Sequence, residues 1–185
     1  SIVAAGVILA FLVISVIDRS LTQSTGNAAK GSIFLAYAIA IGIGLHNLGE
    51  GLAIGAAYTG GSIALGTMLV VGFAAHNTTE GLAIATPLVR ISSRLRHRIV
   101  LHLLGAGLIA GVPAILGLWL GGFVFSPIWA TLFLAIGAGA ILQVIWQIHR
   151  LMSRSSGGSL FDPLNGIGLA LGIVLMYGTG LLIAA

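Results

Sequence analysis

The chain has 185 residues, of which 58% are hydrophobic and only 6% are charged. Soluble domains carry about a quarter charged residues, so this composition excludes an ordinary soluble protein and indicates one covered largely by lipid. The net charge of +4 does not indicate a nucleic-acid partner, because the eight basic residues are scattered between apolar segments, and the lack of cysteine excludes disulfides and thiolate metal sites.

Six apolar segments are long enough to cross a membrane, since a transmembrane helix needs about 20 mainly apolar residues. In chain order they are residues 2–17, 32–57, 62–89, 99–123, 127–149 and 163–184. Gly, Ser, Pro and charged residues mark the breaks between them. The sequence therefore predicts an all-α, polytopic transmembrane helical bundle that forms a single domain over residues 1–185.

The charged residues predict the orientation of this bundle. All eight basic residues fall in or near the first, third and fifth loops: Arg19, Lys30, Arg90, Arg94, Arg96, Arg98, Arg150 and Arg154. The positive-inside rule makes that side cytoplasmic, and six spans then place both termini outside the cytoplasm. Asp18 and Asp162 are expected on the same side, at the water boundary.

The other two acidic residues, Glu50 and Glu80, lie inside predicted spans. Each belongs to a copy of the motif His-Asn-x-x-Glu-Gly-Leu-Ala-Ile, and the copies begin at His46 and His76, 30 residues apart. Residues i and i+4 share a helix face, so each His should lie over the Glu of its own motif. A short turn joins the two segments, which predicts antiparallel neighbours with both motifs at similar depth.

These side chains indicate a metal site. A carboxylate at mid-membrane costs at least a few kcal/mol, and no Lys or Arg lies inside a span to compensate it. A proton or a cation must do so, and His with Glu suits zinc and its neighbours better than calcium or magnesium. The four side chains would form one site, and the carbonyl oxygens of Asn47 and Asn77 could share the carboxylates with a second, weaker ion.

Two further polar residues, Gln143 and Gln147, lie four positions apart on the fifth predicted span. They either line a pathway or hydrogen-bond to a neighbouring helix. Faces of small residues on the predicted helices permit a homodimer without requiring one.

The two motifs resemble those of the ZIP family of metal-ion transporters, in its prokaryotic GufA-like branch. That branch has His-Asn-x-Pro-Glu-Gly-Leu-Ala on its fourth helix and a motif ending Pro-Glu-Gly-Leu-Ala on its fifth, and residues 46–53 and 76–83 match them. Ile17-Asp18-Arg19 is similar to the end of the family's third helix. The resemblance implies helices three to eight of an eight-helix fold, with two N-terminal helices absent from this chain.

By this resemblance, His46, Glu50, His76 and Glu80 match the primary transport-site ligands, and Asn47 and Asn77 match secondary-site positions. Several departures weaken the secondary site. Gly49 and Thr79 replace the motif prolines, residues 111–115 lack the acid expected on the sixth helix, and Gln147 replaces an acid of the seventh. A mononuclear centre is therefore expected rather than a binuclear one.

The expected function is transport of a divalent transition-metal ion towards the cytoplasm across the plasma membrane. Zinc is the first expectation, with Fe²⁺, Mn²⁺ and Cd²⁺ left open because ligand type narrows the metal only loosely. The protein is not expected to be an enzyme, since both glutamates serve as ligands and no His-Glu-x-x-His motif occurs. The remaining alternatives are a proton-coupled carrier of another substrate, an intramembrane metal-binding protein, and an intramembrane metalloenzyme.

Overall fold

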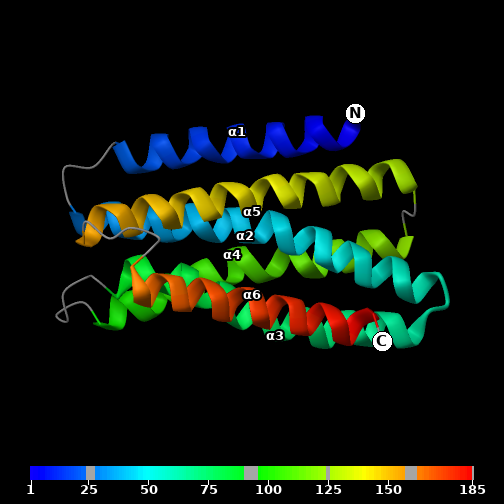
Figure 1. Ribbon diagram of the computed structural model, residues 1–185. Coiled ribbons are helices and arrows are strands. Elements are labelled where there is room, and N and C mark those ends of the chain that lie inside the picture. The colour runs from blue at the N-terminus through cyan, green and yellow to red at the C-terminus, as the bar shows by residue number, and fades with distance from the viewer. Residues whose placement is uncertain (24–27, 90–95, 124–125, 157–161, 185) are drawn as a thin grey trace.

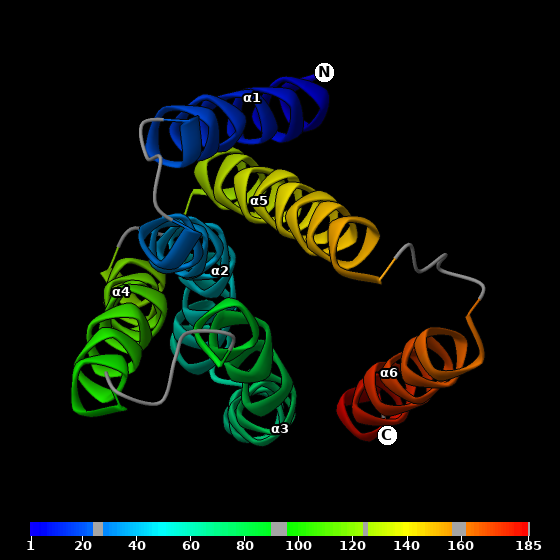
Figure 2. The same ribbon diagram turned by 90° about the vertical axis from the view of Figure 1, so that its left-hand side faces the viewer.

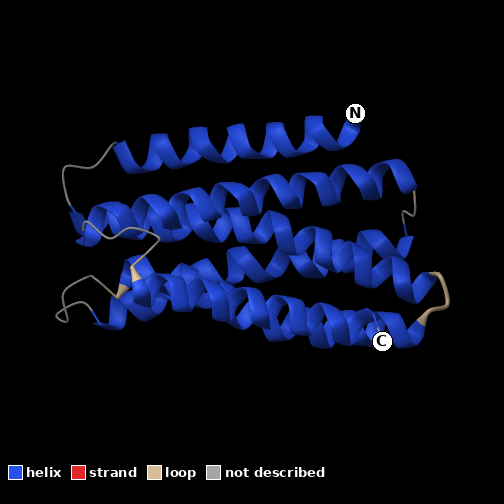
Figure 3. Ribbon diagram, in the orientation of Figure 1, coloured by secondary structure: helices blue, strands red, loops and turns tan. Residues whose placement is uncertain are grey.

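The structure is a computed structural model that describes residues 1–23, 28–89, 96–123, 126–156 and 162–184. Within these ranges the chain is helical apart from short turns and chain ends, and it contains no strand (Figure 3). The all-α prediction is therefore confirmed. The helices are α1 (Ile2–Gln23), α2 (Ala28–Thr59), α3 (Ile63–Leu88), α4 (Arg96–Phe123), α5 (Pro127–Ser156) and α6 (Pro163–Ala184).

The helices run alternately up and down, so both termini lie at the same end of the bundle (Figure 1). Arg19, Lys30, Arg98 and Arg150 lie near the opposite end, which we call the basic end. This alternation agrees with the loop assignment made from the charges. The predicted segments are confirmed as helices, and several extend further towards the basic end than predicted, for example α5, which continues to Ser156.

Four helices are long and apolar enough to cross a membrane, over Ile2–Ser20, Ala28–Thr59, Arg98–Phe123 and Ile128–Ser153. Their outward side chains are large and apolar, which identifies a membrane protein. Helix α3 is not among the four, because the polar run 76–80 lowers its mean hydropathy. Within α6, the apolar stretch Pro163–Gly178 is shorter than these four. Six spans and extracytoplasmic termini stay predictions.

Helix α2 is the centre of the bundle, and it packs against α4, α5, α3 and α1. Figure 2 shows it enclosed by α1, α5, α4 and α3, whereas α6 stands apart from α5 and packs chiefly against α3. The first copy of the motif is thus on the most enclosed helix and the second on a helix nearer the margin.

Helices α2 and α4 approach each other backbone to backbone. A Cβ added at Gly51 would collide with the carbonyl of Ala114, and one added at Gly117 would collide with the carbonyl of Leu48. Only glycine permits such close contact, which gives membrane helices their van der Waals attraction. This contact fixes the face of α2 that turns towards α4 and leaves His46 and Glu50 to face α3 and α5.

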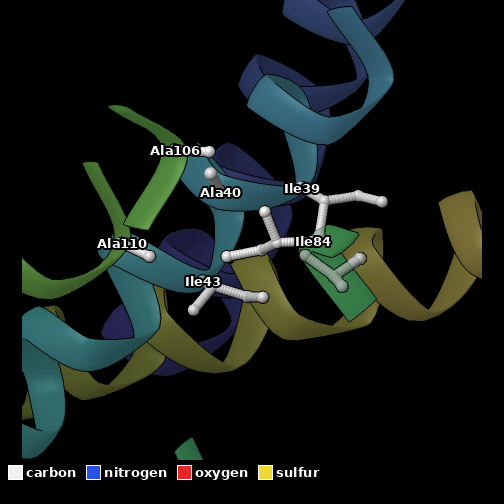
Figure 4. Close-up of a cluster of buried hydrophobic side chains, with 7 residues drawn as sticks. Ile39, Ala40, Ile43, Ile84, Ala106 and Ala110 are labelled. Carbon is white, nitrogen blue, oxygen red and sulfur yellow. The ribbon is translucent and has the colours of Figure 1, made fainter. Parts of the chain in front are cut away.

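An apolar cluster fills the space among α2, α3, α4 and α5. Its buried members are Ile39, Ala40, Ile43, Ile84, Ala106, Ala110 and Val144. In Figure 4 the side chains of Ile39, Ile43 and Ile84 lie close together, between α2 and α3. The cluster lies one to two helical turns from the motif residues, towards the basic end.

Candidate metal centre

The centre lies where the two motif helices face each other across their hairpin. The turn at Gly60–Gly61 joins α2 to α3, and Gly61 has a φ of 78°, a conformation that glycine adopts without strain. Both helices run without interruption through the motifs. In the second motif, Thr79 stands where the ZIP motif that this chain resembles has proline, and its hydroxyl donates a hydrogen bond to the His76 carbonyl at 2.6 Å. The side chains are therefore presented by two regular, antiparallel helices.

Glu50 is the hub of the centre. Its Oε1 lies 2.5 Å from Nε2 of His76 on α3 and 3.3 Å from Nε2 of His46 on its own helix. One ligand atom from each of these three residues lies within 4.8 Å of the others, as a shared metal ion requires. Glu50 and His76 are each 6% exposed, so the contact between them is almost fully shielded.

Glu80 lies at the edge of this group. Its Oε1 is 3.9 Å from Nε2 of His46, and its side chain is 16% exposed. Its Oε2 is buried and has no hydrogen-bond partner among the residues that the structure describes. A carboxylate oxygen can accept a hydrogen bond or bind a cation, so this buried atom requires a water molecule or an ion as its partner. The fourth predicted ligand is thus adjacent to the three-residue group but outside it.

The two asparagines differ in what they contact. Asn77 Nδ2 donates to Glu50 Oε2 at 3.3 Å, whereas Asn47 Nδ2 donates to the Ala110 carbonyl of α4 at 3.1 Å. Both carbonyl oxygens, Asn47 Oδ1 and Asn77 Oδ1, are buried without a hydrogen-bond partner in the described part of the chain. These amides orient the site and leave two further acceptor atoms beside it.

The chemistry of the centre follows from this donor set. Two imidazoles and two carboxylates converge in an apolar bundle, and within the described ranges the ion pairs of both glutamates are with these histidines. Such a set can hold either a proton shared between His and Glu or a divalent cation that replaces it. Imidazole nitrogen with carboxylate oxygen suits zinc and its transition-metal neighbours.

The structure places Gln143 and Gln147 away from the centre, towards the basic end. Gln143 accepts a hydrogen bond from the Ser15 hydroxyl at 2.9 Å, which ties α5 to α1. Gln147 is 2% exposed, and neither atom of its amide has a hydrogen-bond partner among the described residues. Gln143 thus bonds to a neighbouring helix, one of its two predicted uses, and Gln147 lines a cavity.

An ion pair near the basic end was missed by sequence reasoning. Asp18, expected at the water boundary, is only 2% exposed, and the Arg150 guanidinium donates to its Oδ2 at 3.1 Å. Asp18 does lie near the basic end, and its burial was not predicted because α2 and α5 cover the end of α1. The sequence does place an acid and an arginine at the basic-side ends of two predicted spans. It does not indicate that these two spans are neighbours.

Comparison with known proteins gives no further assignment: no family model, no curated protein and no solved structure matches this chain. The relation to ZIP transporters stays a prediction that rests on the two motifs. The structure brings together the side chains of His46, Glu50 and His76, of which Glu50 and His76 are buried, in a membrane protein.

Proposed function

We propose that this protein transports a divalent transition-metal ion, zinc in the first place, across the plasma membrane towards the cytoplasm. The observation that carries the proposal is the convergence of His46, Glu50 and His76 inside an apolar helical bundle. Intramembrane ionisable groups generally mark an ion pathway, which supports transport as the role of these side chains.

In this proposal, His46, Glu50 and His76 are the core ligands of one ion and Glu80 completes the set. The ion comes from the side of the termini, displaces the proton shared by Glu50 and His76, and leaves at the basic end when that end opens. The predicted six spans and the positive-inside rule support the assignment of the basic end to the cytoplasmic side. The resemblance to ZIP transporters supports the same reading.

The test is metal flux through purified protein in proteoliposomes. We expect uptake of labelled zinc by the wild-type chain and a loss of most of it in Glu50→Gln, which keeps the side-chain volume but removes the charge. Thr86→Ala is the matched control, because Thr86 is exposed on α3 and its hydroxyl donates a hydrogen bond within its own helix, to the Leu82 carbonyl. Equal zinc flux in Glu50→Gln and Thr86→Ala would refute the proposal.

The 2.5 Å contact between Glu50 and His76 also favours a second candidate, a proton-coupled carrier of another substrate. A carboxylate and an imidazole in direct contact can relay a proton without any metal. Elemental analysis of the purified protein separates the two functions. A carrier of this second kind contains no stoichiometric transition metal, even after incubation with zinc.

A further inference from the structure

A cavity lies between α1, α2 and α5 near the basic end of the bundle, apart from the metal centre. Its volume is about 220 Å³, and it is lined by Asp18, Ala28, Gly31, Ser32, Leu35, Gln147, Arg150 and Leu151. A buried water needs only roughly 10–15 Å³ of such space, so the cavity is large enough for many waters. Its lining includes a carboxylate, a guanidinium, an amide and a hydroxyl.

The buried amide of Gln147 requires polar partners in this cavity. Its side chain is 2% exposed, and both its Nε2 and its Oε1 lack a hydrogen-bond partner among the described residues. An amide buried in an apolar medium without partners costs several kcal/mol. Water in the cavity removes that cost, because it can accept from Nε2 and donate to Oε1.

The cavity, the apolar cluster and the metal centre follow one another along three helices. On α2 the order is Ser32 and Leu35, then Ile39 and Ile43, then His46 and Glu50, at spacings of three or four residues that keep them on one face.

Helices α5 and α3 give the same order. On α5, Arg150 and Gln147 line the cavity and Val144 belongs to the cluster. Further along, α5 approaches α2 at Gly137, where an added Cβ would lie 3.3 Å from the Cα of His46. On α3, His76 precedes Ile84 of the cluster. The three helices therefore place apolar side chains between the cavity and the metal centre.

We propose that the cavity is a water-filled vestibule that opens at the basic end and is closed from the metal centre by an apolar barrier of Ile39, Ile43, Ile84 and Val144. The vestibule would take up a hydrated divalent cation that has left the metal centre, and this part of the inference rests on the proposed function. Dehydrated cations do not cross an apolar constriction, so this barrier holds the centre shut towards the basic side.

The ion pair in the vestibule makes it a passage rather than a second binding site. Arg150 already neutralises Asp18 at 3.1 Å, so the pair contributes no net charge that would retain a cation. The remaining polar lining, Gln147 and Ser32, is neutral. Released ions therefore encounter hydration but no strong anionic ligand on this path.

The chain has no cysteine, so single-cysteine variants test the vestibule directly. A charged, membrane-impermeant thiol reagent is added to the basic side of oriented vesicles. We expect Ser32→Cys and Gln147→Cys to react at least about tenfold faster than Ile39→Cys and Ile43→Cys, because a thiol in dry apolar surroundings is unreactive. Ile145→Cys is the matched control on α5, since Ile145 is 57% exposed on the outer surface that lipid covers.

Leu35→Cys provides a second vestibule position where Gln147→Cys fails to fold, and labelling after denaturation verifies that each thiol is intact. The inference is overturned if the vestibule cysteines react no faster than Ile145→Cys, or if Ile43→Cys reacts as fast as Ser32→Cys. The thiol-labelling experiment does not depend on metal transport by the protein. A vestibule that labels as expected in a protein without metal flux would refute the proposed function and leave the vestibule standing.

Discussion

The two copies of the motif have the same local sequence and different surroundings. The first, on α2, is enclosed by α3, α4 and α5, whereas the second, on α3, packs mainly against α2 and less closely against α6 and α4. Glu50 is 6% exposed and contacts both histidines, while Glu80 is 16% exposed and pairs only with His46 in the described part of the chain. Equivalent residues of a repeat can thus have unequal roles, because the neighbouring helices decide which of them is shielded.

The motif glycines provide the largest test of this difference. Gly51→Ala would drive a Cβ into the Ala114 backbone, whereas a Cβ at Gly81 meets nothing within 4 Å. We expect Gly51→Ala to destabilise the protein by roughly 3 kcal/mol or more, as an overpacked site does. Gly81→Ala should be neutral or up to about 1 kcal/mol stabilising, because alanine favours the helix. Thermal unfolding of both variants in detergent measures this contrast, and equal losses of Tm would remove the claimed asymmetry.

The glutamates provide the second test, at the level of metal affinity. We expect Glu50→Gln to weaken zinc binding by at least about a hundredfold, which corresponds to about 2.7 kcal/mol. Glu80→Gln should weaken it by about tenfold, since Glu80 lies at the edge of the group. Isothermal titration with zinc measures both constants. The ranking is wrong if Glu80→Gln proves the more damaging substitution.

We expect the smallest change in zinc affinity from substitutions of the two asparagines. These variants also test whether the protein binds one ion or two. Asn47→Ala and Asn77→Ala should each change zinc affinity by less than about tenfold, because the Asn47 amide donates to the Ala110 carbonyl and the Asn77 amide contacts the group through Glu50 Oε2. Asn77→Ala should have the larger effect of the two, since Asn77 donates to Glu50. Elemental analysis should give one zinc per chain in the wild type and in both variants. Two ions per wild-type chain would contradict the mononuclear prediction.

Much of the candidate site could be predicted from sequence because it depends on local geometry. Helix periodicity alone places His46 over Glu50 and His76 over Glu80, and a short turn alone makes the two helices antiparallel. One site of His46, Glu50, His76 and Glu80 was predicted in this way, and the structure brings the ligand atoms of the first three together. The separation of Glu80 from that group could not be predicted, because it depends on how deeply each helix is covered by others.

The sequence by itself determined that this is an all-α membrane protein with six helices and a paired His/Glu motif, because hydropathy and helical spacing are properties of neighbouring residues. Only the tertiary structure decided that Glu50 is the hub, that Asp18 is buried against Arg150, and that Gln147 lines a cavity near the basic end. The physical reason is that burial depends on helices remote in the chain. Asp18 and Arg150 are 132 residues apart, and no local pattern specifies that they meet.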